Sequence, residues 1–132
     1  MPTDAQWRAL AAAARAASAN AYAPYSRFAV GAAVLAADGR VFSGCNVENA
    51  SFGLTICAER NAVFQAVAAG ACNLVAVALY TPTAEPASPC GACRQVLAEF
   101  GVRDVLCVAQ DGREARHALD VLLPHSFKLE RE

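Results

Sequence analysis

The chain of 132 residues carries a net charge of −1 at pH 7, with 56% hydrophobic and 17% charged residues. This length predicts a single domain over residues 1–132. The balanced charge offers no basic surface for DNA or RNA, and no apolar run is long enough to span a bilayer, so neither nucleic acid nor a membrane is an expected partner. Charged residues are few for so small a domain, which favours partner subunits that cover part of the apolar surface.

The alanine-rich stretch at residues 9–21 predicts a helix of the mature protein rather than an export signal. Asp4 and Trp7 precede it where a basic leader would stand, and Arg15 interrupts it. We therefore expect the six cysteines in a reducing cytoplasm. Clustered thiols there bind metal or perform chemistry more often than they form disulfides.

A helix and a hairpin are predicted first along the chain. A capping box at residues 3–6 and apolar residues at helical spacing predict a helix that ends near Asn20. Residues 28–36 and 41–48 read as two strands, joined by the strong turn signal Asp-Gly at 38–39.

The second half of the chain alternates helices and buried strands. Ser88 is expected to cap a helix, with Pro89 in its first turn. In chain order, the predicted elements are a helix at 56–69, a strand at 74–80, a helix from 88 to 101, a strand at 102–109 and a short helix at 119–123. This order predicts one mixed sheet with helices on both faces.

Three of the cysteines are spaced as metal ligands. Cys90 and Cys93 stand three residues apart in the first turns of a predicted helix, and Cys57 begins the preceding helix in the same way. The partial positive charge at each helix start lowers thiol pKa values, and Arg60 can tune the site further by hydrogen bonding to a cysteine sulfur. Three protein ligands leave a fourth zinc position open for water, as in catalytic zinc sites.

Glu59 is the predicted proton carrier of this site. It follows Cys57 by two residues, so the two side chains converge only if Cys57 lies at an irregular helix entry. The pattern CAE at 57–59 followed by PCGAC at 89–93 matches the signature of zinc deaminases. In the reaction of such enzymes, one carboxylate would carry protons between the attacking water, a ring nitrogen of the substrate base and the leaving amine.

Other interpretations of the cysteines are weaker. A redox pair at 90–93 would leave the CAE segment unexplained. A structural four-cysteine zinc site would have to recruit Cys45, Cys72 or Cys107, although no second CxxC exists. We interpret those three cysteines as inert core residues. A noncatalytic zinc or redox protein is thus the alternative from a different functional class.

Four segments carry a family resemblance: 21–26 (AYAPYS), 44–50 (GCNVENA), 57–60 (CAER) and 89–95 (PCGACRQ). In this order and spacing they resemble the small homotetrameric zinc-dependent cytidine deaminases, over nearly the whole chain. The resemblance implies an α/β protein, with a three-layer α/β/α fold around one mixed sheet of about five strands. It also implies hydrolytic deamination of cytidine and 2'-deoxycytidine to uridine and 2'-deoxyuridine, with release of ammonia, in pyrimidine salvage.

The same resemblance implies roles for individual residues. Asn46 and Glu48 would bind the ribose 3'-hydroxyl, Phe28 would pack against the base, and the backbone amide of Ala58 would meet the base carbonyl. Phe127 would reach into the site of a neighbouring subunit. Within the enzyme class, a deaminase of modified cytosine nucleosides is the nearest rival, and nucleic-acid editing is disfavoured by the absence of a basic stripe.

The placement of Phe28 is left open by the strand pattern. A strict two-residue turn at 38–39 puts Phe28 on the face opposite Asn46 and Glu48. Either a bulge near Gly44 intervenes or Phe28 precedes the regular strand. Phe52 stands where many relatives have tyrosine.

Overall fold

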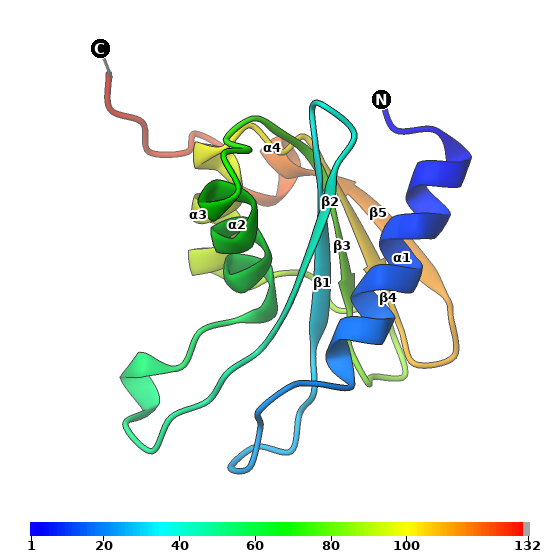
Figure 1. Ribbon diagram of the computed structural model, residues 1–132, viewed down its shortest axis with the longest axis vertical. Helices are drawn as coiled ribbons and strands as arrows, with labels where there is room; N and C mark the ends of the chain where they lie inside the picture. Colours follow the sequence, from blue (N-terminus) through cyan, green and yellow to red (C-terminus); the bar gives the residue numbers. More distant parts are fainter. Residues whose placement is uncertain (131–132) are drawn as a thin grey trace.

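In the part of the chain that the structure describes, five strands form one mixed sheet in the spatial order β2-β1-β3-β4-β5 (Figure 1). The computed structural model describes residues 1–130. In chain order the strands are β1 (Gly31–Ala36), β2 (Val41–Cys45), β3 (Leu74–Tyr80), β4 (Asp104–Val108) and β5 (Glu114–Ala118). The β3–β4 pair is parallel and the other three pairs are antiparallel, so the predicted mixed sheet is confirmed.

Helices cover both faces of this sheet, as the three-layer prediction requires (Figure 1). One face packs against α1, and the opposite face packs against α2, α3 and α4. The helices are α1 (Asp4–Ser18), α2 (Ala58–Ala68), α3 (Gly91–Glu99) and α4 (Leu119–Leu122), with a 3₁₀ turn at Phe52–Leu54. Within the described residues, none of the helices combines the length and the hydropathy that crossing a bilayer requires.

The central strands are apolar throughout because they are buried on both faces. In β1, Val34 points into the cluster under α2 and α3, whereas Leu35 points into the cluster under α1. In β3, Val77 likewise points into the cluster under α2 and α3, and Ala78 into the cluster under α1. A strand covered on both sides has no polar row, which is why residues 74–80 read as one continuous apolar run.

Two loops meet at one end of the sheet, below the strands in Figure 1. The first joins α1 to β1 and the second joins β2 to α2. Tyr22 and Val47 form an isolated parallel bridge between them, and Val47 pairs with Ile56 on its other side. Ile56 is therefore extended, so α2 starts at Ala58 rather than at the predicted residue 56.

The predicted cap of α3 is wrong, and one strand was not predicted along the chain. Ser88 does not cap α3, because the N-cap residue is Cys90 and the helix starts at Gly91. The Ser88 hydroxyl instead accepts a hydrogen bond from Arg94. The strand β5 had no prediction of its own along the chain, because its residues alternate between exposed and half-buried at the sheet edge and lack an apolar run.

Candidate active site

The sulfur atoms of Cys57, Cys90 and Cys93 converge between the starts of α2 and α3. All three lie within 4.8 Å of one another, and the Cys57 and Cys90 sulfurs are 3.9 Å apart. A tetrahedral zinc with Zn–S bonds of about 2.3 Å places its sulfurs about 3.8 Å apart. The spacing and the soft donor set therefore fit a zinc ion, and these three residues could hold one.

The helix caps explain how these side chains meet. Cys57 is the N-cap of α2, with φ −70° and ψ 156°, and Cys90 is the N-cap of α3, with φ −65° and ψ 166°. Neither cysteine makes a side-chain capping hydrogen bond, so both thiols are free to face the cluster. The irregular helix entry expected for Cys57 is thus confirmed. Cys93 sits in the first turn of α3 and is fully buried.

Nearby donors tune the charge of the cluster. Arg60 donates from Nη2 to the Cys57 sulfur at 3.3 Å. A hydrogen bond with Cys93, together with the Arg60 guanidinium, lowers the pKa of Cys57 to about 5. The same contact with Cys57, together with burial, raises the pKa of Cys93. These contacts favour a thiolate at Cys57, which lies between a helix amino end and a cation.

Glu59 is a buried carboxyl group beside the sulfurs. Only 4% of its surface is exposed. Burial, with the charge of Cys57 as a second cause, raises the pKa of Glu59 to about 7. A carboxyl group with a pKa near neutrality can both accept and donate a proton under working conditions, which is what a shuttle requires.

Asn46 joins the predicted sugar-binding segment to the segment that carries Phe28. Its Oδ1 accepts from the Val30 N–H at 2.9 Å, and its Nδ2 donates to the Phe28 carbonyl at 2.7 Å. Phe28 precedes β1, and the β1–β2 register continues without a shift from Leu35 to Gly31. The bulge alternative near Gly44 is therefore wrong, and the alternative in which Phe28 lies before the strand is correct.

Glu48 fixes the loop between α1 and β1. Its carboxylate accepts from the backbone N–H groups of Tyr25 and Ser26 at 3.0 and 3.1 Å, and also from the Ser26 hydroxyl. The hydroxyl contact is the main reason why the pKa of Glu48 lies below its usual value. Glu48 therefore stays ionised at neutral pH and remains a strong acceptor.

Ala58 and Phe127 lie at different ends of the helical layer. Ala58 is buried as the first residue of α2, where backbone N–H groups have no partner within the helix. Phe127 is 68% exposed, and its carbonyl accepts from Nε2 of Gln95. Phe127 lines a small groove with residues 98–101, at the end of α3 opposite its cysteines. The structure thus separates Phe127 from the metal cluster of its own chain.

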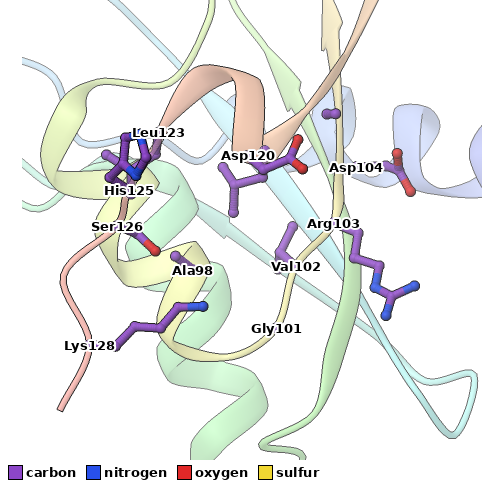
Figure 2. A pocket seen from close by; sticks show the side chains of 12 residues that line it. Ala98, Gly101, Val102, Arg103, Asp104, Asp120, Leu123, His125, Ser126 and Lys128 are labelled. Atoms are coloured by element: carbon purple, nitrogen blue, oxygen red, sulfur yellow. The ribbon is translucent and has the colours of Figure 1, made fainter.

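A cavity of about 750 Å³ lies elsewhere, between the end of α3, the start of β4 and the C-terminal segment (Figure 2). None of the cysteines, and neither Glu59 nor Asn46, lines it.

Three cysteines lie outside the metal cluster. Cys107 is buried as expected, and Cys45 is half-buried. Cys72 is exposed, so its interpretation as a core residue is wrong.

Comparison with known proteins connects this geometry to a family. Residues 5–109 match the model of the cytidine and deoxycytidylate deaminase zinc-binding region. The chain belongs to this family. A cytidine deaminase from Sporosarcina psychrophila is 47% identical over 84% of this chain and 83% of that protein. One from Mycobacterium tuberculosis is 46% identical over 96% of this chain and 93% of that protein.

Solved structures of the deaminase family share the fold. The crystal structure of cytidine deaminase from Burkholderia pseudomallei has a TM-score of 0.87 and 49% sequence identity, covering 91% of this chain and 98% of that chain. The predicted α/β/α fold and the family resemblance are both confirmed.

Within this deaminase motif, sequence reasoning gave no role to Arg94. Its Nε donates to the Pro89 carbonyl at 2.8 Å, its Nη1 to the Leu122 carbonyl at 2.8 Å and its Nη2 to the Ser88 hydroxyl at 3.0 Å. Pro89 directly precedes Cys90, so Arg94 fastens the segment that presents this sulfur. An arginine directly after Cys93 was the available signal, but its partners are set by the tertiary fold.

We expect Arg94→Lys to release bound zinc faster, because lysine cannot make the three hydrogen bonds of the guanidinium fork. Loss of a contact that supports a metal ligand typically costs 10- to 100-fold in affinity, so release to a chelator should be about tenfold faster. A chromophoric chelator follows the release, and Arg8→Lys, at an exposed position of α1, is the matched control. Equal release rates for both variants and wild type would contradict the role of Arg94.

Proposed function

We propose that this protein hydrolyses the 4-amino group of cytidine and 2'-deoxycytidine, giving uridine or 2'-deoxyuridine and ammonia. The observation that carries the proposal is the meeting of three cysteine sulfurs and one buried carboxyl group at two helix starts. Membership of the deaminase family and 46–49% identity to cytidine deaminases support the choice of reaction. The reaction would serve pyrimidine salvage in the cytoplasm.

Cys57, Cys90 and Cys93 are the proposed ligands of one zinc ion per chain. When bound, zinc supplies a Lewis acid that lowers the pKa of a coordinated water. Arg60 reduces the negative charge that three thiolates would otherwise bring to the site, because it donates to the Cys57 sulfur. The two helix amino ends act in the same direction.

Glu59 moves the protons of the reaction. It takes one proton from the attacking water, whose oxygen bonds to C4 of the base, and gives that proton to N3. The second water proton passes through Glu59 to the amino group. The C4–N4 bond then breaks with its electron pair on nitrogen, and ammonia leaves. A single carboxyl group with a pKa of about 7 can serve each transfer.

The nucleoside would lie between the metal cluster and the two paired loops. Phe28 would pack against the base, and the Ala58 N–H would donate to the base carbonyl. Asn46 and Glu48 would bind the ribose 3'-hydroxyl. Asn46 uses one of its Nδ2 hydrogens for the Phe28 carbonyl, which leaves the other for the sugar. The ionised carboxylate of Glu48 offers further acceptor positions.

Glu59→Gln should keep zinc and fold but lose activity by ~10²–10⁴-fold, because an amide preserves the shape without carrying protons. Cytidine absorbance gives the rate, and metal analysis gives the zinc content. The matched control is Glu114→Gln, at an exposed position of β5. A Glu59→Gln enzyme within about tenfold of wild type would remove Glu59 from the proposed mechanism.

Cytidine and 2'-deoxycytidine should be good substrates, whereas cytosine and cytidine monophosphate should be poor ones. The free base gives Asn46 and Glu48 no hydroxyl to bind. A phosphate group would bring negative charge near the ionised Glu48. Parallel assays at equal concentration test this range. Efficient deamination of the monophosphate would refute the assignment of the sugar-binding residues.

We further propose a homotetramer whose active sites are shared between subunits. Phe127 is exposed in the single chain and separated from its own cysteines, as expected of a residue that serves a neighbour. Other apolar side chains are exposed as well, including Phe64 and Val67 on α2. Docking Phe127 over the base of a neighbouring site would bury it and exclude water from that site.

Phe127→Ala should raise the KM for cytidine about tenfold, with zinc content unchanged, because burial of a phenylalanine side chain contributes about 1.5–3 kcal/mol. Leu129→Ala, in the same exposed segment, is the control. Light scattering of the active enzyme reports the assembly. A fully active monomer, or an unchanged KM in Phe127→Ala, would overturn the shared site.

A further inference from the structure

The end of β2 and the first turns of α2 touch backbone to backbone. Gly44 makes this possible because it has no side chain. A Cβ at position 44 would lie 2.4 Å from the Ala62 nitrogen and 2.8 Å from the Ala58 carbonyl oxygen. The strand and the helix therefore cannot be separated by a side chain at this point.

Asn61 adds a directed contact beside Gly44. It lies in the first turn of α2, and its own N–H donates to the Cys57 carbonyl at 3.1 Å. Its half-buried side chain donates from Nδ2 to the backbone carbonyl of Cys45 at 2.8 Å. The hydrogen bond thus holds the last residue of β2 against the helix that begins at Cys57.

This contact joins the helix that carries the metal cluster to the strand that precedes the proposed sugar-binding residues. On the helix side, Cys57 belongs to the metal cluster. On the strand side, Cys45 is followed directly by Asn46, whose side chain also holds the backbone of Phe28 and Val30. A displacement of Cys45 would therefore shift the proposed ribose-binding residues, Asn46 and Glu48, relative to the metal.

We propose that Asn61 is a positioning residue, which sets the distance from the metal cluster to the residues that bind the ribose 3'-hydroxyl. This inference rests on the proposed function. Asn61 itself touches neither metal nor substrate in this role. Its effect is confined to substrates that use the 3'-hydroxyl, since only they need Asn46 and Glu48 at the correct distance from the reacting carbon.

The test compares kcat/KM for cytidine and for 3'-deoxycytidine, which lacks that hydroxyl. Asn61→Ala should lower the value for cytidine about tenfold, because the 3'-hydroxyl would lose its hydrogen bond to the ionised Glu48 carboxylate. A tenfold change corresponds to about 1.4 kcal/mol. The value for 3'-deoxycytidine should change less than about twofold. Zinc content, measured separately, should stay at the wild-type level.

Two further variants make the test decisive. Asn61→Asp keeps the side-chain shape but faces the Cys45 carbonyl with an acceptor in place of the donor, and a helix amino end tolerates its charge. It should show the same preferential loss on cytidine even if Asn61→Ala folds poorly. Gln65→Ala, an exposed amide one turn along α2, should leave both substrates unaffected.

Equal losses on the two substrates would overturn the positioning role and leave the proposed function intact. Unchanged activity on cytidine in both Asn61 variants would overturn it as well. A zinc-loaded wild type that deaminates neither nucleoside would instead remove the proposed function, and the inference with it.

Discussion

Two helix starts that face the same point are the constraint on which the rest of the site depends. An N-cap residue normally accepts a hydrogen bond from the first turn, and loss of that bond costs about 0.5–2 kcal/mol. Cys57 and Cys90 occupy the caps of α2 and α3 without making it. Both helices thus forgo a stabilising contact, and their thiols and amino ends remain directed at the site. Metal binding can restore the lost stability, because coordination free energy adds to folding free energy.

The sheet brings these helix starts together. The unit β3-α3-β4 is a parallel crossover, so α3 begins after the carboxyl end of β3, where ligands bind in open α/β sheets. The start of α2 reaches the same end of the sheet because Gly44 admits its backbone against β2. Arg94 and Asn61 then fasten the two helix starts to neighbouring segments. In both cases a side-chain donor bonds to a backbone carbonyl, so the helix starts have contacts beyond those of the cysteines.

The sequence predicted the chemistry better than the contacts that support it. Helical spacing and the two-part deaminase pattern predicted Cys57, Cys90, Cys93 and Glu59 as site residues, and the structure brings the three sulfurs together beside the buried Glu59. Ser88 was misplaced as a cap, since nothing local shows that its hydroxyl has a partner in Arg94. Hydrogen bonds over 16 residues or more, such as that from Asn61 to Cys45, have no local signature. They follow from the fold and cannot be inferred from propensity.

The strand that gave no apolar signal, β5, also protects the edge of the sheet. An exposed edge with apolar side chains is a template for a strand of another chain. At this edge Glu114 and Arg116 are charged and exposed. The Arg116 guanidinium lies 4.4 Å from the centre of the Trp7 ring, where it covers the margin of the α1 core. A strand from another chain that paired with β5 would lie directly beside the charged side chains of Glu114 and Arg116. The alternation of exposed and half-buried residues, which left β5 without an apolar run, thus opposes edge-to-edge aggregation.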